Sequence, residues 1–152
     1  MTLVGATLGG IITYYATIKM VRLQIHKEII WPFVSILEEM YRLVGMYSDG
    51  KIDDYFVFYF QNLYELLIRI LFHRGGLFLV LNTLSTYENP KMNLKLILQP
   101  IRAIQYEIIK NKQNPKKINN QSISQIFHEF LKTKEQFEDI KNKLLRRSKQ
   151  YL

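Results

Sequence analysis

The sequence predicts an all-α protein with one N-terminal transmembrane helix followed by a helical bundle of four or five helices. Residues 2–18 carry no charge, and apolar side chains in the remainder recur at helical spacing. Strand signals are scarce, because β-branched runs with strict alternation are missing. The 152 residues accommodate one anchor and one compact body. We therefore expect an anchor and membrane-exit helix over residues 1–31 and a bundle over residues 32–152.

The uncharged run is slightly short for a membrane span. At helical rise, residues 2–18 extend roughly 26 Å, against about 30 Å for the hydrocarbon core. The span then depends on its inner end, where Tyr14 and Tyr15 suit the interface and Lys19 can extend its ammonium to the headgroups. Lys19 and Arg22 follow the run, whereas no basic side chain precedes it. The positive-inside rule predicts a single-pass protein of the cell membrane, with its N-terminus outside and its C-terminal domain cytoplasmic.

Three other interpretations of this run remain open. A cleaved signal peptide places its basic region before the apolar core, whereas here the basic residues come after it. A buried core helix of a soluble protein is compatible with a short run that holds four threonines and three glycines. An amphipathic helix in the interface needs a charged face, which the run lacks. The single-pass anchor accounts best for an uncharged segment with a basic exit.

A strip of small residues lies within the run. Gly5 and Gly9 form a GxxxG pair, and Ala6 and Gly10 repeat the spacing one residue later. Small residues four positions apart allow two membrane helices to approach closely. The strip predicts a helix-packing surface in the membrane and a homo-oligomer as one candidate state.

The next elements follow from proline and from apolar spacing. Proline cannot donate a hydrogen bond to the preceding turn, so we expect a bend at Trp31 and Pro32. Apolar residues at helical spacing then predict a helix over residues 33–47, which closes in a turn at residues 48–50. Asp53 or Asp54 is expected to cap the next helix, which runs to about residue 74. Because this helix has only a narrow polar stripe, we expect it at the centre of the bundle.

The second half of the chain predicts three further elements. Residues 77–84 form a short apolar run, which is typical of a buried helix. A break at residues 87–91 precedes a helix over residues 92–109 that is bent or restarted at Pro100. The polar residues 110–121 indicate an exposed linker. One last helix is expected to start near Ser122, which has capping-box spacing with Gln125.

The excess of positive charge lies in the C-terminal third. The formal net charge is +8, and residues 110–152 carry eleven basic side chains against four acidic ones. We expect these basic residues to contact anionic lipid, because the membrane is the nearest polyanion to a tethered body. Nucleic acid is the alternative ligand, and a solvated face without a ligand is the third interpretation. The candidate contacts form two clusters: Lys110, Lys112, Lys116 and Lys117, then Lys141, Lys143, Arg146, Arg147 and Lys149.

The sequence holds no pattern typical of a catalytic, cofactor-binding or metal site. The three histidines are far apart and lack ligand spacing, and the absence of cysteine excludes thiolate sites and disulfides. Adjacent carboxylates point apart on a helix, so the acidic pairs do not form catalytic dyads. We therefore expect a protein that is not an enzyme and that uses no cofactor.

Residues 5–40 read GATLGGIITYYATIKMVRLQIHKEIIWPFVSILEEM. A glycine-containing span, a basic exit, an aromatic–proline pair and a Leu-Glu-Glu motif follow one another in this segment. The arrangement resembles the start of small uncharacterised prokaryotic proteins that have one N-terminal membrane anchor and a cytoplasmic helical domain. The resemblance implies this architecture and carries no activity.

Together these features predict a membrane-tethered, non-enzymatic scaffold, signalling or interaction module that holds a protein partner at the inner leaflet. Its expected contact surfaces are the basic clusters and any aromatic side chains left unburied. The alternative is a small membrane-active effector of toxin or phage-defence type, in which the span, alone or together with residues 55–74, rearranges to perturb the bilayer. An enzyme with a cryptic site is a third hypothesis.

Overall fold

The computed structural model describes residues 2–73, 75–83, 90–113 and 120–149, and the regular structure in these ranges is helical throughout. This confirms the all-α class. The elements are α1 (Thr2–Ile25), η1 (His26–Ile30), α2 (Trp31–Met46), α3 (Asp54–Ile68), η2 (Arg69–His73), α4 (Gly76–Thr83), α5 (Pro90–Gln113), α6 (Asn120–Lys132) and α7 (Lys134–Lys149). The elements η1 and η2 are π-helical turns of five residues each.

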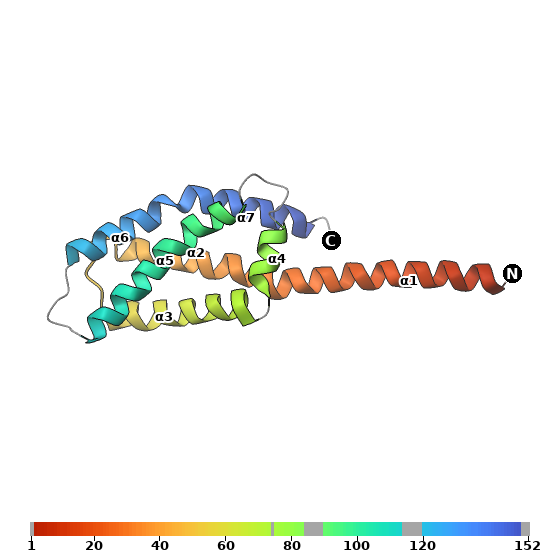
Figure 1. Ribbon diagram of the computed structural model, residues 1–152, viewed down its shortest axis with the longest axis horizontal. Coiled ribbons are helices and arrows are strands. Elements are labelled where there is room, and N and C mark those ends of the chain that lie inside the picture. Colours follow the sequence, from red (N-terminus) through yellow and green to blue (C-terminus); the bar gives the residue numbers. More distant parts are fainter. Residues whose placement is uncertain (1, 74, 84–89, 114–119, 150–152) are drawn as a thin grey trace.

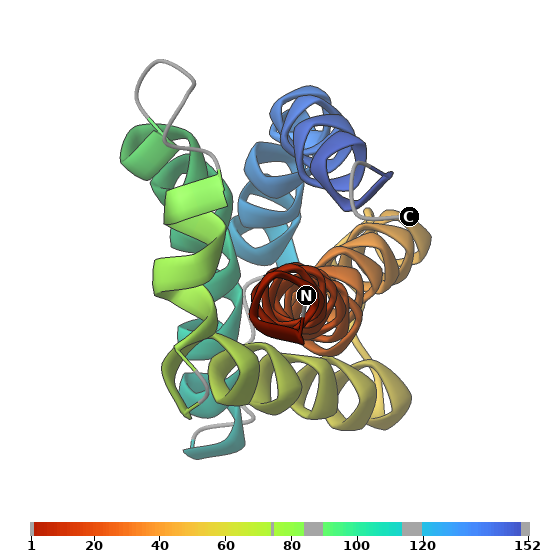
Figure 2. The ribbon, with the colours of Figure 1, turned by 90° about the vertical axis from the view of Figure 1, so that its right-hand side faces the viewer.

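The body is a helical bundle from which α1 projects as a long arm (Figure 1). A view along the long axis shows α2, α3, α5 and the α6–α7 pair around a common core (Figure 2). Helix α2 packs against α3 and α6, and α5 packs against the same two helices, so the arrangement closes on itself. The short α4 lies at the end of the body from which α1 projects, where it contacts η1 and η2.

Aromatic side chains fill the core between these helices. Tyr41 of α2 stacks on Phe130 of α6 at 4.2 Å between ring centroids and on Phe137 of α7 at 5.0 Å. Burying such a side chain stabilises a fold by about 1.5–3 kcal/mol, and edge or stacked ring pairs add to this. Helices α2, α3, α6 and α7 contribute fully buried phenylalanine side chains, namely Phe33, Phe56, Phe60, Phe127, Phe130 and Phe137.

Helix α2, and not α3, is the central member of the bundle. Eight side chains of α2 are buried, and it contacts α3, α6 and α7. Helix α3 buries one face, whereas Tyr55 is 56% and Phe58 is 67% exposed on another. The prediction of a central α3 was wrong, because a narrow polar stripe does not require every other side chain to be buried, and single aromatic residues are often left at a surface.

The start of α3 confirms the predicted cap. Asp53 Oδ1 accepts a hydrogen bond from the Phe56 backbone N–H at 2.8 Å, and the Tyr47 hydroxyl donates to the same carboxylate at 2.9 Å. The preceding turn ends at Gly50, whose φ of 78° lies in the left-handed region. A Cβ there would lie 2.9 Å from the Ser124 nitrogen, so glycine allows α6 to pack closely on this turn.

The predicted bend at Trp31 and Pro32 is replaced by a π-helical turn just before them. Trp31 keeps helical angles, φ −65° and ψ −47°, and its N–H donates to the carbonyl of His26, five residues earlier. Proline lacks an N–H and crowds the carbonyl four residues before it, and a wide turn accommodates both effects. In Figure 2, α1 is seen end-on while α2 runs obliquely away from it.

Helix α5 is continuous across Pro100, so the predicted restart there does not occur. The buried side chains of Ile97, Ile101 and Ile104 lie on one face through this point and hold the helix in the core. The helix also extends to Gln113, so the first part of the predicted linker is helical. Of the break predicted at residues 87–91, residues 87–89 lie outside the described residues, and residues 90 and 91 already belong to α5. Of the linker predicted at residues 110–121, residues 114–119 lie outside the described residues, and residues 120 and 121 belong to α6.

The predicted last helix is in fact two helices, α6 and α7, separated at Thr133. The Thr133 hydroxyl donates to the Phe130 carbonyl at 2.6 Å, a local bond that competes with continued helix at this position. Helix α6 begins at Asn120, so Ser122 lies within the helix and the predicted capping box is wrong.

Candidate membrane-facing surface

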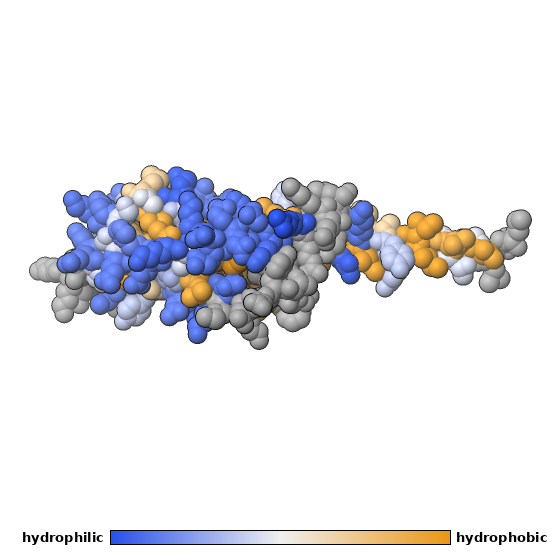
Figure 3. Space-filling view, turned by 90° about the horizontal axis from the view of Figure 1, so that it is seen from above, coloured by the Kyte–Doolittle hydropathy of each residue, from blue (hydrophilic) through white to orange (hydrophobic). Residues whose placement is uncertain are grey.

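Helix α1 carries its apolar side chains in the open. Every side chain from residue 4 to residue 17 is exposed, and Val4 and Ile12 are 66% and 68% exposed. The buried-core interpretation of this segment is therefore wrong. Figure 3 shows the contrast between the largely hydrophobic α1 and a mostly hydrophilic face of the body. None of the described helices reaches the combination of length and hydropathy required of a transmembrane span.

The threonine hydroxyls of α1 bond to the backbone of their own helix. Thr13 Oγ1 donates to the Gly9 carbonyl at 2.8 Å, and Thr17 Oγ1 donates to the Thr13 carbonyl at 2.8 Å. Thr7 Oγ1 donates to the Val4 carbonyl at 3.1 Å. These donors are therefore paired without water, which lowers the cost of moving the helix into an apolar phase.

The small-residue strip of α1 touches no other part of the described chain. A Cβ added at Gly5, Gly9 or Gly10 would meet nothing within 4 Å, and Ala6 is exposed. The strip is thus geometrically free for a helix that is not part of this chain.

The residues predicted for the membrane interface lie along α1 from the C-terminal part of the uncharged segment toward the body. Tyr14 and Tyr15 are exposed and pack edge to face, with ring centroids 6.2 Å apart. Lys19 and Arg22 are exposed further along α1, and Arg22 lies in its last turn. Apolar segment, tyrosines and cations therefore follow one another along a single projecting helix.

The described residues of the two predicted basic clusters lie on different helices, at the C-terminal end of α5 and in the central and C-terminal parts of α7. Lys110 and Lys112 stand at the C-terminal end of α5, far from α1, whereas α7 ends on the side from which α1 projects (Figure 1). Lys116 and Lys117 lie outside the described residues, and so do the side chains of Arg147 and Lys149. The described cations therefore do not form one continuous basic track.

Several of these cations already have partners in the fold. Lys141 pairs with Glu38, which raises the pKa of the lysine, and its Nζ also lies 3.6 Å from Glu138. Lys143 Nζ lies 2.7 Å from Asp139 Oδ2, and Lys112 Nζ donates to Gln61 Oε1 at 2.9 Å. Arg146 is exposed and forms no ion pair with the described residues. In the α7 cluster, the charge available to an external anion is therefore concentrated toward its C-terminal end.

An apolar groove that the sequence did not indicate lies between η2, α4 and α5. Its volume is about 470 Å³, within the range of small-molecule sites, and Lys95 and Arg102 stand on its rim with Gln99. The apolar lining comes from η2, α4 and α5 and consists of Phe72, Leu77, Leu81, Leu94 and Leu98. The residues that line the groove come from separate helices and are scattered in the sequence, so no continuous sequence motif marks the groove.

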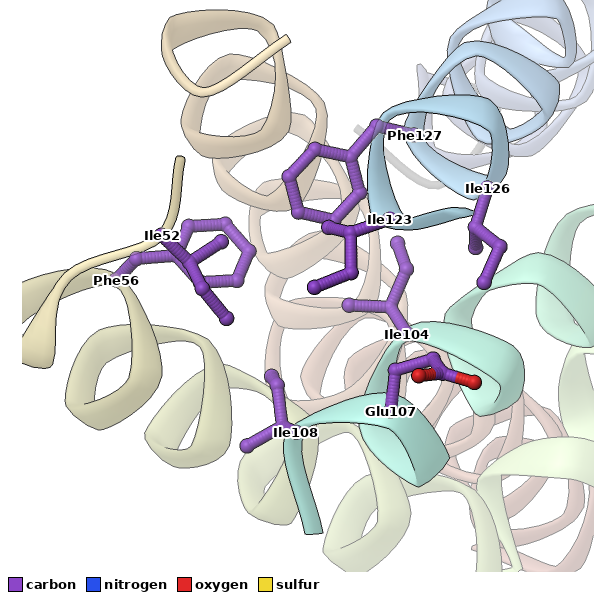
Figure 4. Close-up of a pocket in the computed structure, with 8 residues that line it drawn as sticks. All are labelled: Ile52, Phe56, Ile104, Glu107, Ile108, Ile123, Ile126 and Phe127. Atoms are coloured by element: carbon purple, nitrogen blue, oxygen red, sulfur yellow. The ribbon is translucent and has the colours of Figure 1, made fainter. Parts of the chain in front are cut away.

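A second cavity lies between α3, α5 and α6 and is too small for a ligand. Figure 4 shows its lining of isoleucine and phenylalanine side chains, with Glu107 at one side. The cavity measures about 10 Å³, roughly the space of one water molecule. It is a packing defect of the core and not a binding site.

In the part of the chain that the structure describes, no three His, Cys, Asp or Glu side chains lie close enough to hold a metal ion. Comparison of the chain with protein-family models, with curated proteins and with solved structures finds no match. The functional proposal therefore depends on the surfaces of α1 and of the bundle.

Proposed function

We propose that the protein is a membrane-tethered, non-enzymatic interaction module, with α1 in the bilayer and the bundle at the inner leaflet. The observation that carries this proposal is the exposure of α1, which carries no charged side chain over residues 4–17 and is covered there by no other described element. Apolar surface left in water costs about 25 cal/mol per Å², so such a helix favours an apolar environment.

The proposal has to account for the modest hydropathy of α1. Hydropathy scales count each threonine hydroxyl as a polar group facing solvent, whereas Thr7, Thr13 and Thr17 satisfy their hydroxyls within the helix. The 24 residues of α1 extend roughly 36 Å at helical rise, so the helix continues past its short uncharged part and brings Lys19 and Arg22 to the boundary of a hydrocarbon core of about 30 Å. Both facts support insertion of α1.

The basic side chains in the C-terminal part of α1 favour one orientation of this helix across the membrane. Lys19 and Arg22 lie at the body end of the helix, and the described part of α1 before them has no charged side chain. By the positive-inside rule, the proposed location of the body is cytoplasmic. The exposed Arg146 of α7 lies on the same side of the body and supports contact with anionic headgroups.

The aromatic side chains left exposed on the body are the proposed surface for a protein partner. Tyr55 and Phe58 of α3 and Tyr106 of α5 are all more than half exposed. In one form of the membrane-active alternative, α3 leaves the bundle. Phe56 and Phe60 oppose that step, because both are fully buried and the Phe56 ring packs against that of Phe127 of α6 in a tilted pair, with centroids 5.2 Å apart.

The tether is tested by fractionation of cells that express the full chain. We expect the wild type in the membrane fraction after an alkaline carbonate wash, and we expect protease to reach the body only after the cells are opened. Ile11→Lys should shift the chain out of this fraction, because a lysine at the centre of a span costs on the order of 3 kcal/mol.

Ile109→Lys is the matched control. Ile109 lies on α5 and is 47% exposed, close to the 52% of Ile11, so both variants place the same new charge at a similarly exposed isoleucine. The control should stay in the membrane fraction. Recovery of the wild type in the carbonate supernatant would overturn the tether, and equal behaviour of the two variants would show that α1 has no special role.

A further inference from the structure

The groove between η2, α4 and α5 has the composition of a site for an amphiphile. Its walls are leucine and phenylalanine, and Phe72 remains 52% exposed at its edge. Two cations, Lys95 and Arg102, lie seven residues apart on α5, about two helical turns, and therefore on the same side of that helix. Both are exposed and form no ion pair with the described residues.

The groove lies toward the end of the body that faces the bilayer when α1 is inserted in it. Helix α4 lies at the end of the body from which α1 projects (Figure 1), and it contacts η1, the turn that follows α1. A close approach fixes this position, since a Cβ on Gly76 would come within 3.0 Å of the Ile29 side chain. The groove wall formed by α4 is therefore held beside the exit of α1.

We propose that this groove binds one anionic glycerophospholipid from the bilayer, with an acyl chain along the leucine wall and the phosphate between Lys95 and Arg102. The volume of about 470 Å³ fits one chain and excludes a whole protein helix with its side chains. Each methylene group buried contributes to affinity, and the two cations select for negative charge.

Charge complementarity favours the lipid over a second copy of α1, the other apolar partner that the molecule offers. Helix α1 has no acidic side chain, so it would leave Lys95 and Arg102 without a counter-charge. An anionic phospholipid supplies both the apolar chain and the phosphate. This inference rests on the proposed membrane tether, because the tether brings the groove to the lipid.

The test uses the full chain in nanodiscs of phosphatidylcholine that contain a small fraction of phosphatidylglycerol with a photoreactive acyl chain. After illumination, mass spectrometry maps the labelled peptides. Label on α1 reports the tether, and label on α4 and on residues 90–102 reports the groove. We expect both, with the groove label much weaker when the photoreactive lipid is phosphatidylcholine.

Charge reversal at the rim gives the decisive comparison. Lys95→Glu combined with Arg102→Glu should lower the groove label at least about tenfold and leave the α1 label unchanged. Lys132→Glu combined with Lys134→Glu is the matched control, because it makes the same charge change at two exposed lysines that do not line the groove. Leu98→Trp, which fills the groove without a charge change, should also remove the groove label.

The outcomes separate the two proposals. Label on α1 alone, or a groove label equal in the rim variant and its control, would overturn the lipid site and leave the tether standing. If the chain does not enter nanodiscs, the tether fails. The groove is then probed in solution with short-chain photoreactive phosphatidylglycerol, where equal labelling of wild type and rim variant would overturn it.

Discussion

The hydroxyl of Tyr41 lies 2.7 Å from the hydroxyl oxygen of Thr133, the residue that separates α6 from α7. Since the Thr133 hydroxyl donates to the Phe130 carbonyl, Tyr41 is the donor in the first bond. The ring of Tyr41 also stacks on Phe130 and Phe137. One side chain of α2 thus holds together the ends of both C-terminal helices.

The buried Tyr41 predicts a loss of stability at alkaline pH. Burial raises its pKa to about 12 from an ordinary value of 10. Between these values the unfolded chain releases the proton and the folded chain keeps it, so the free energy of unfolding falls as pH rises. At about 1.4 kcal/mol per pH unit, the contribution is complete below pH 10 and about 2–3 kcal/mol smaller at pH 12.

Denaturant unfolding of the wild type and of Tyr41→Phe across this pH range checks the prediction. At neutral pH the variant should lose about 1 kcal/mol, the usual contribution of one hydrogen bond. Its stability should then decline less steeply above pH 10 than that of the wild type. Parallel curves for the two proteins would contradict the assignment.

The hydrogen bonds to the Asp53 carboxylate lead us to expect a loss of folding stability at acidic pH. The hydrogen bond from the Phe56 N–H, joined by that from the Tyr47 hydroxyl, holds the pKa of this carboxyl below its usual value. The cap therefore stabilises the fold above that usual value, and the contribution disappears as pH falls through the lowered pKa. Asp53→Ala should lower the thermal midpoint at pH 7 and flatten the acid dependence, and the neighbouring Asp54→Ala should do neither to the same degree.

Two glycines should respond in opposite directions to alanine. Gly50→Ala forces a side chain into a left-handed conformation and against Ser124, and it should destabilise the fold by at least about 1–2 kcal/mol. Gly45 lies in α2, where an added Cβ would meet nothing within 4 Å, so Gly45→Ala should stabilise by up to about 1 kcal/mol. Chemical denaturation measures both, and changes of equal sign would be inconsistent with this geometry.

The ion pairs of α7 predict which cations attract lipid. Arg146→Gln should weaken the preference of the full chain for anionic over zwitterionic vesicles by about fivefold, or about 1 kcal/mol. Lys141→Gln should have a smaller effect, because Glu38 already neutralises Lys141. Vesicle flotation at increasing salt gives the comparison, and an equal loss in both variants would show that the ion pair does not shield Lys141.

The free strip of α1 predicts self-association in the membrane. Replacing Gly5 and Gly9 by leucine should reduce association in a membrane two-hybrid assay, because larger side chains hold the two helices apart. Val4→Leu changes a large side chain beside the strip and serves as the control. An unchanged signal in the glycine variant would remove the strip as an interface.

The part of the fold that follows from local pattern was predictable from the sequence. The apolar spacing of residues 33–47 matches α2, and the polar residues before α3 identified Asp53 as a candidate cap. Of the two alternatives predicted at Pro100, a bend or a restart, the restart is wrong, because long-range packing of Ile97 and Ile101 holds the helix together where local chemistry favours a break. Thr133 was missed since its bond with Tyr41 joins residues 92 positions apart.

The candidate functional surfaces also include features that were predictable from local sequence and features that depend on long-range packing. The uncharged length of α1 and its basic exit are local properties, and the sequence showed them directly. The pairing of Lys141 with Glu38 depends on the docking of α7 against α2, and composition alone counted this lysine as free charge. The groove beside Lys95 and Arg102 arises only when η2, α4 and α5 come together.

Residues 2–46 form one uninterrupted helical run through α1, η1 and α2. Helix α1, which projects from the body, and helix α2, at the centre of the core, are therefore joined without a loop, and the five π-helical residues of η1 lie between them. A tilt of α1 must be absorbed in that wide turn or transmitted to the ring stack around Tyr41. Force applied to the arm thus reaches the core without crossing any loop.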